Sequence, residues 1–155
     1  MSGSSLDGLD IAHCQMEWDG KAISKWKLLA AETMPYSKVW HDRLKGLPEQ
    51  NALNFAKTDT YFGYYMGELV NQFKKEKGIT HLDYIASHGH TIFHDPERRY
   101  TIQIGHGGAL AAITNNKCNE RTSISFSMPP SMSWTTMMSR AAGSKMREDM
   151  LLRRR

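Results

Sequence analysis

The sequence predicts a single α/β domain with a mixed sheet, and three observations lead to this fold class. An Asp-Gly pair at Asp19 and Gly20 separates two apolar runs, which is typical of a two-residue β-hairpin. Farther along, apolar residues recur at helical spacing between Phe62 and Phe73. This helix leads into the short apolar run "LDYIASHGH", and a helix followed by a strand indicates a crossover to a parallel strand.

The first strand is expected at Leu9–Trp18, "LDIAHCQMEW", where both faces are mostly apolar. Leu9, Ile11 and His13 would share one face, because side chains alternate along a strand, and the opposite face begins at Ala12. A strand with two apolar faces is typically covered on both sides. The second strand of the hairpin follows in "KAISKWKLLAAETMPY".

The remaining elements follow in chain order. "SKVWHDRLKGL" predicts a short polar helix or turn that ends near Gly46 and Pro48. A longer helix ends at the cations and glycine of "KKEKG". "TIFH", a turn at "DPER" and "YTIQIG" predict a second hairpin, and "GGALAAITN" a short helix with small residues. The stripe of the longer helix consists of Phe62, Tyr65, Met66, Leu69 and Phe73.

Charge and composition change near Asn116. The chain of 155 residues has a net charge of +4. Residues 1–116 contain 12 Lys and Arg against 13 Asp and Glu, whereas residues 117–155 contain 8 against 3. We therefore expect an incomplete domain at 1–116 and a mostly poorly ordered basic tail at 117–155, with one or two helical turns at most in "SKMREDMLLRR". Terminal arginines without interleaved aromatic residues do not indicate a nucleic-acid partner.

Several other classes of protein are disfavoured. Cys14 and Cys118 lie far apart without CxxC spacing, so the sequence predicts buried free thiols rather than a disulfide framework or a zinc site. No apolar run reaches the roughly 18 residues of a membrane helix, and no signal peptide is recognisable. We expect a cytoplasmic protein with no membrane partner.

The opening stretch "SGSSLDGLD" has the composition of a phosphate-binding loop. Glycines allow a backbone that directs several N–H groups at one anion, and serine hydroxyls add donors to phosphate oxygens. Carboxylates beside a bound triphosphate can hold Mg²⁺ or its waters. On composition alone an ordinary solvent loop remains the alternative. The candidate nucleotide-binding residues are Gly3, Ser4, Ser5, Leu6, Asp7, Gly8 and Asp10.

Three stretches together resemble one known family. "MSGSSLDGLDIA" is similar to the N-terminal signature "MSGTSLDGVD" of anhydro-N-acetylmuramic acid kinases, with Ser4 in place of threonine. "IASHGHTIFHDP" resembles the family's "SHGQTVxHxP", and "TIQIGHGGALAAITN" resembles "LQIGDxxxLAxxTG". The segments "PYSKVW" and "TYFGYYMGELV" also fit, so the resemblance spans residues 1 to about 115.

The resemblance implies a fold, a reaction and a set of site residues. The fold would be a partial actin-like and hexokinase-like (ribonuclease H-like) ATPase domain. The family uses ATP and water to convert 1,6-anhydro-N-acetylmuramic acid to N-acetylmuramic acid 6-phosphate in cell-wall (peptidoglycan) recycling. By resemblance, Gly3 to Asp10 would surround the phosphates of ATP, with Mg²⁺ as the accompanying ion. The amino sugar would lie near Ser87, His88, Gly89 and Thr91.

Five of the seven histidines fall between His81 and His106, which leaves three interpretations open. They could be metal ligands, hydrogen-bonding turn residues or contacts to the sugar. No nearby Cys or carboxylate completes a tetrahedral set around His88 and His90, so no metal site is expected. His106 stands where the family often has aspartate, and no role is transferred to it.

The family's next segment, "DFRxxDxAxGGQGAPLVP", has no counterpart after Asn116. It supplies the aspartate proposed to activate water and a second phosphate loop, so we assign no catalytic residue to this chain. The strand expected before the first loop is also missing, which would leave the loop held on one side and the hairpin with an exposed edge. We therefore expect an inactive kinase fragment with a foreign or frame-shifted tail. The alternative is a non-catalytic sugar- or nucleotide-binding protein.

Overall fold

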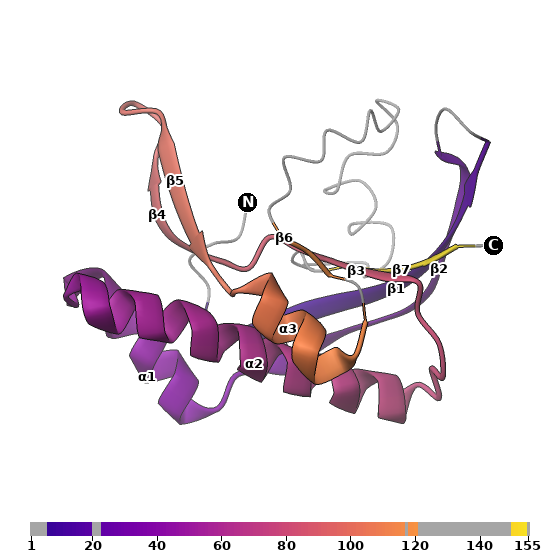
Figure 1. The fold of residues 1–155 in the computed structure, drawn as a ribbon, viewed down its shortest axis with the longest axis horizontal. Coiled ribbons are helices and arrows are strands. Elements are labelled where there is room, and N and C mark those ends of the chain that lie inside the picture. Colours follow the sequence, from indigo (N-terminus) through magenta and orange to yellow (C-terminus); the bar gives the residue numbers. More distant parts are fainter. Residues whose placement is uncertain (1–5, 20–22, 117, 121–149, 155) are drawn as a thin grey trace.

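The computed structural model describes residues 6–19, 23–116, 118–120 and 150–154. Figure 1 shows a layer of helices on one side of a sheet, with a separate hairpin projecting from the body. The elements in order are β1 (Gly8–Trp18), β2 (Ile23–Pro35), α1 (Lys38–Gly46), the short 3-10 helix η1 (Leu47–Glu49), α2 (Ala52–Glu76), β3 (Tyr84–Ser87), β4 (His90–Asp95), β5 (Tyr100–Ile104), α3 (Gly107–Thr114), β6 (Cys118–Glu120) and β7 (Met150–Arg154).

The main sheet has five strands in the order β2-β1-β7-β3-β6 and is mixed, as the sequence predicts. β1 and β2 form the expected antiparallel hairpin, with Gly8 opposite Pro35 at its open end. β7 pairs in parallel with β1 and antiparallel with β3. These directions make β3 run the same way as β2, so the predicted crossover to a parallel strand is confirmed, although the two strands are not neighbours.

The hydrophobic core lies between this sheet and the helices. Leu9 and Ile11 of β1 pack against Phe62, Met66 and Phe73 of α2, all nearly inaccessible to solvent. The other face of β1 has a smaller buried cluster, centred on Ala12, Cys14 and Met16. Both faces of β1 are thus covered, and this explains why the strand lacks the polar alternation of a half-exposed one.

Helix α2 is longer than the predicted apolar stripe. It begins at Ala52, because the side chain of Asn51 caps it by accepting a hydrogen bond from the backbone N–H of Asn54 at 2.9 Å. It ends as predicted at the run of lysines before Gly78, whose φ is +66°. No helix among the described residues combines the length and the apolar character needed to cross a bilayer.

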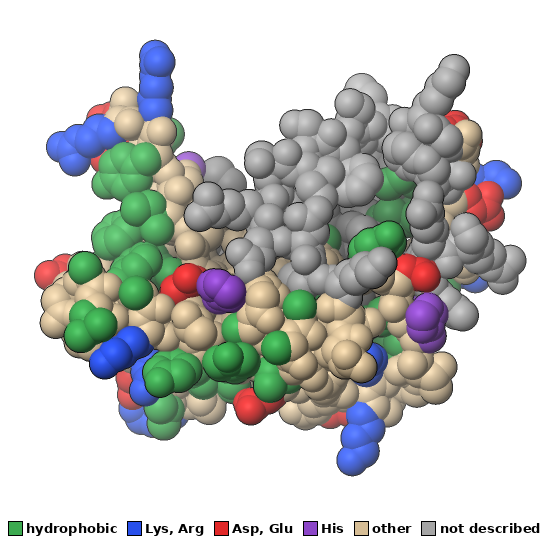
Figure 2. Space-filling view, viewed as in Figure 1, with side chains coloured by type: hydrophobic (Ala, Val, Ile, Leu, Met, Phe, Trp, Pro, Cys, Tyr) green, Lys and Arg blue, Asp and Glu red, His purple; other side chains and the backbone are tan. Residues whose placement is uncertain are grey.

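The second predicted hairpin, β4 and β5, forms a two-stranded sheet of its own. It projects away from the helices, with hydrophobic side chains along its length and basic ones at its tip (Figure 2). β4 contacts the start of α2, where the rings of Phe55 and Phe93 stack with centroids 6.2 Å apart.

The tail differs from its expected form in the part that the structure describes. The end of "SKMREDMLLRR" is not helical: Met150–Arg154 is strand β7, and Cys118–Glu120 is strand β6. β7 fills the position between β1 and β3, so β1 does not expose the edge expected of it, and β2 is the outer strand. Backbone groups on two unpaired strand edges favour a strand between them over an isolated helical turn. Residues 121–149 lie outside the described part, and the domain boundary near 116 stays a prediction.

Candidate functional site

The predicted phosphate loop enters the fold at the start of β1. Gly3, Ser4 and Ser5 lie outside the described residues, whereas Leu6, Asp7 and Gly8 are placed. The backbone carbonyl of Asp7 accepts a hydrogen bond from the N–H of Tyr36 at 3.3 Å. A Cβ at Gly8 would lie 2.4 Å from the carbonyl oxygen of Met34, so only glycine fits against β2 there.

Asp10 is a buried acidic residue of β1, two residues after Gly8. It alternates with Leu9 and Ile11 and is therefore directed to the face of β1 opposite α2. Its Oδ1 accepts a hydrogen bond from the hydroxyl of Thr33 on β2 at 2.5 Å. This hydrogen bond holds the side chain of Asp10 in one orientation.

The predicted sugar-contacting residues lie on the turn between β3 and β4. Ser87 ends β3, and its Oγ accepts a hydrogen bond from the N–H of Gly89 at 3.0 Å. Gly89 has a φ of +69°, and a Cβ there would lie 1.9 Å from the carbonyl oxygen of Ile104. The turn is therefore tight and pressed against the end of β5.

Gln103 of β5 brings two of these residues together. Its side-chain amide nitrogen lies 3.3 Å from Nδ1 of His88 and donates to the hydroxyl of Thr91 at 3.2 Å. Sequence reasoning did not select Gln103, although it lies inside the third family-like stretch. The signal that could have found it is hairpin register, because Gln103 is the cross-strand partner of Thr91.

Tyr36 connects the loop and the turn. Its N–H binds the carbonyl of Asp7, and its ring meets the ring of His90 edge-on, with centroids 6.3 Å apart. Phe62 of α2 packs against both rings. Burial lowers the pKa of His90 from 6.5 to about 4, with a smaller contribution from the charge of His88, so His90 is neutral at pH 7.

The stretch after β5 is fixed to α2 by Asp59. Its carboxylate accepts from the N–H of Gly105 at 2.7 Å, and its backbone carbonyl accepts from the N–H of His106 at 3.2 Å. His106 caps helix α3, since its Nδ1 accepts a hydrogen bond from the N–H of Ala109 at 3.2 Å. His106 is thus the N-cap residue of α3, a position at which short polar side chains that accept a hydrogen bond are preferred.

The other clustered histidines also have local partners. His81 lies 3.4 Å from the carboxylate of Asp83, and His94 lies 2.9 Å from the hydroxyl of Thr101. Within the described ranges, no three His, Cys, Asp or Glu side chains gather closely enough to hold a metal ion. Cys14 is a buried free thiol, as predicted, and burial raises its pKa to about 12.

Comparison with known proteins identifies the same region. A sequence model of the family described as anhydro-N-acetylmuramic acid kinase matches residues 1–118. The protein of that name from Pseudoalteromonas atlantica is 33% identical over 127 residues, covering 74% of this chain and 31% of the relative. Those from Pseudomonas syringae pv. tomato and Clostridioides difficile are 35% and 34% identical, over 119 and 128 residues. Their matches cover 74% and 76% of this chain and 31% and 33% of the relatives.

This chain therefore spans about a third of the length of the curated relatives it matches. The match includes the loop, the Tyr36 connection and the turn with Gln103, and it ends at the first residue of β6. The chain belongs to the anhydro-N-acetylmuramic acid kinase family, of which it represents the N-terminal portion.

Proposed function

We propose that this chain is the nucleotide- and sugar-contacting part of an ATP-dependent amino-sugar kinase with an actin-like fold. The reaction would convert 1,6-anhydro-N-acetylmuramic acid, ATP and water to N-acetylmuramic acid 6-phosphate and ADP. The observation that supports it best is the position of Tyr36, which contacts the loop through its backbone and the turn through its ring. Two candidate ligand-binding segments, distant in sequence, are thereby held on one support.

The described part of the loop fits a phosphate-binding role. Its backbone is fixed at Asp7 by Tyr36 and at Gly8 by close contact with β2, and a nest of N–H donors requires such rigidity. We propose that Gly3 to Asp10 hold the phosphates of ATP, with the hydroxyls of Ser4 and Ser5 as donors. ATP would supply the phosphoryl group. Asp7 and Asp10 would orient Mg²⁺, directly or through its waters.

We further propose that the sugar lies against Ser87, His88, Gly89 and Thr91. Sugar hydroxyls need donors and acceptors in fixed positions, and Gln103 holds the His88 and Thr91 side chains in one polar row. Phosphoryl transfer depends mainly on the positioning of the two reactants and on stabilisation of charge. The residues of the loop and the turn would supply part of that positioning.

A second candidate function is ligand binding without turnover. The observation that favours it is that residues 117–155 contain no "GGQG" stretch. In the family pattern this stretch follows the position of Asn116, together with the aspartate proposed to activate water. In this case the chain would bind the sugar or the nucleotide and release it unchanged. The two candidates predict the same complexes and differ only in the formation of ADP.

Calorimetric titration of the full chain with Mg-ATP, and separately with 1,6-anhydro-N-acetylmuramic acid, tests binding. A coupled assay for ADP with both ligands present tests turnover. Ser4→Ala should weaken ATP binding by about tenfold, because a hydrogen bond to a charged phosphate is lost. Ser24→Ala is the matched control, since the Ser24 hydroxyl donates to the carbonyl of Glu17 at the far end of the hairpin from the loop. If neither Mg-ATP nor the sugar gives a heat of binding, both candidates are contradicted.

A further inference from the structure

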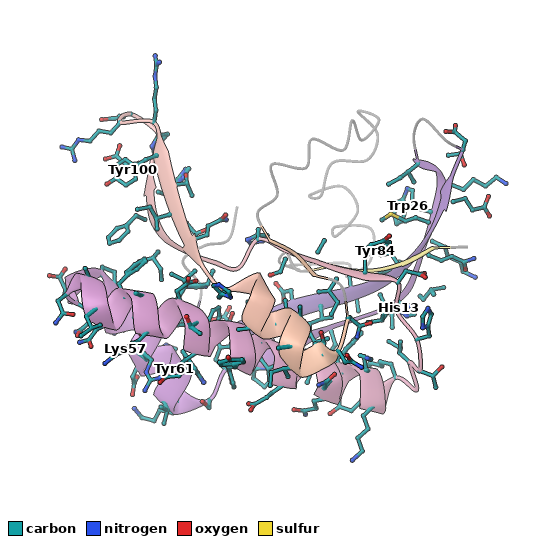
Figure 3. All side chains as sticks on the ribbon, in the orientation of Figure 1. His13, Trp26, Lys57, Tyr61, Tyr84 and Tyr100 are labelled. Atoms are coloured by element: carbon teal, nitrogen blue, oxygen red, sulfur yellow. The ribbon has the colours of Figure 1, made fainter. Side chains whose placement is uncertain are left out.

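A cavity of about 410 Å³ lies outside the candidate site, between the end of α1, helix η1 and the first half of α2. Lys57 and Tyr61 project at this side of α2, away from the β4–β5 hairpin (Figure 3). Arg43, Gln50 and Asn54 complete its polar wall. The volume is in the range of pockets for small ligands, and it is larger than a bare inorganic ion needs.

The cavity has an excess of positive charge. Arg43 of α1 and Lys57 of α2 both line it, and neither forms an ion pair with any residue in the described ranges. The single acidic group in its wall is Asp42. Its carboxylate is already bound by Lys38 at 2.5 Å and by His41 at 3.2 Å, and these contacts lower its pKa. The two cations of the wall therefore outnumber its one carboxylate, which is already engaged by Lys38 and His41.

Arg43 is held in place before any ligand arrives. Its guanidinium carbon lies 4.9 Å from the centroid of the Trp40 ring, in a cation–π contact. Trp40 in turn stacks on Tyr65 of α2, with centroids 5.0 Å apart and an angle of 18° between the rings. A side chain fixed in this way loses less conformational entropy when it binds a ligand.

The amide groups of the wall are also ordered. The side-chain nitrogen of Asn54 donates to the side-chain oxygen of Gln50 at 3.0 Å. This arrangement leaves the amide nitrogen of Gln50 as a donor beside the guanidinium and the ammonium. The wall thus combines a forked cation, a point cation and neutral donors, a set suited to the oxygens of a phosphate group.

We propose that this cavity binds a phosphate group, either as inorganic phosphate or as the phosphate ester of a small polar molecule. The site shares no residue with the loop or the turn, so it is a second anion site on the helical side of the fold. Arg43 would bind two phosphate oxygens through its fork, and Lys57 would approach from the facing helix.

The test is an NMR titration of the full chain, labelled with ¹⁵N, with inorganic phosphate, glucose 6-phosphate and glucose. We expect saturable shifts of the backbone amides around Arg43, Asn54 and Lys57 with both phosphate compounds and none with glucose. Tighter binding of glucose 6-phosphate assigns the site to an ester, and equal affinity assigns it to free phosphate. The double variant Arg43→Gln/Lys57→Gln should weaken binding by about tenfold or more.

The matched control is Lys45→Gln/Lys75→Gln, which removes the same charge from the same two helices outside the cavity. It should weaken binding much less than Arg43→Gln/Lys57→Gln does, because neither Lys45 nor Lys75 lines the cavity. Equal weakening in both double variants, or no saturable shift at these amides, would overturn the proposal. Shifts of the Leu6 to Asp10 amides with Mg-ATP report the proposed nucleotide site separately, and the Arg43→Gln/Lys57→Gln variant should retain them.

Discussion

At the scale of single residues, Gly89 is the position where the turn of the candidate site tolerates no side chain. Its φ of +69° is costly for any other residue, and a Cβ would lie 1.9 Å from a backbone oxygen. We expect Gly89→Ala to lower the free energy of unfolding by more than about 3 kcal/mol, since strain and overlap act together. Urea denaturation of the variant and the parent chain measures this change.

Gly46 provides the control for that substitution. It ends α1, and a Cβ there would meet no atom within 4 Å. Gly46→Ala should therefore change the unfolding free energy by less than about 1 kcal/mol, and toward greater stability, because alanine has the higher helix propensity. An equal loss in the two variants would show that the β3–β4 turn is not specifically constrained.

At the scale of elements, the cap of α3 is His106, whose Nδ1 accepts the hydrogen bond from the N–H of Ala109. We expect His106→Ala to lower the unfolding free energy by about 1 kcal/mol, because the N–H of Ala109 loses its partner. His106→Asn should keep or raise stability, since asparagine is among the preferred N-cap residues and adds no charge beside Asp59. Thermal unfolding of the two variants and of His94→Ala, an exposed histidine on β4, makes the comparison.

The elements predicted from sequence are those whose signals are local. The β1–β2 hairpin is encoded by a turn dipeptide between apolar runs, and the core stripe of α2 by its periodicity. By contrast, β7 gives no such signal, because its strand form depends on β1 and β3, which lie far away in sequence. The hydrogen bond from the N–H of Gly105 to the carboxylate of Asp59 is equally non-local, so the sequence pattern does not predict it.

In the candidate site, too, the sequence predicts the local features and not those that depend on distant residues. The turn at Ser87 and Gly89 follows from its glycine and its short polar residues. The burial of His90 does not, because its neighbours Tyr36 and Phe62 come from two other elements. His90 is buried and His88, two residues earlier, is half-buried, and tertiary packing alone sets this difference.

At the scale of the whole molecule, His90 makes stability depend on pH, since it lies where β4 meets α2 and the segment after β2. Its pKa is near 6.5 in an unfolded chain and about 4 in the fold. The unfolded state therefore binds a proton first as the pH falls, and stability present above pH 6.5 is lost progressively down to pH 4. The contribution amounts to up to about 3 kcal/mol.

His90→Phe tests this linkage, because it keeps the ring contacts and removes the titrating group. Unfolding free energies measured by urea between pH 7 and pH 4 should fall less steeply in this variant than in the parent chain. The remaining slope belongs to the other titrating groups, which both chains share. Identical slopes would contradict the assignment of the pH dependence to His90.

The position of β7 also sets an order for folding. The β1–β2 hairpin closes over a short loop and can form as soon as its residues leave the ribosome. Met150 pairs with Ala12 over a separation of more than a hundred residues, so the middle of the sheet closes only after β7 has been synthesised. Until then β1 and β3 each present an open edge, and the newly made chain is exposed to pairing with a second copy of itself.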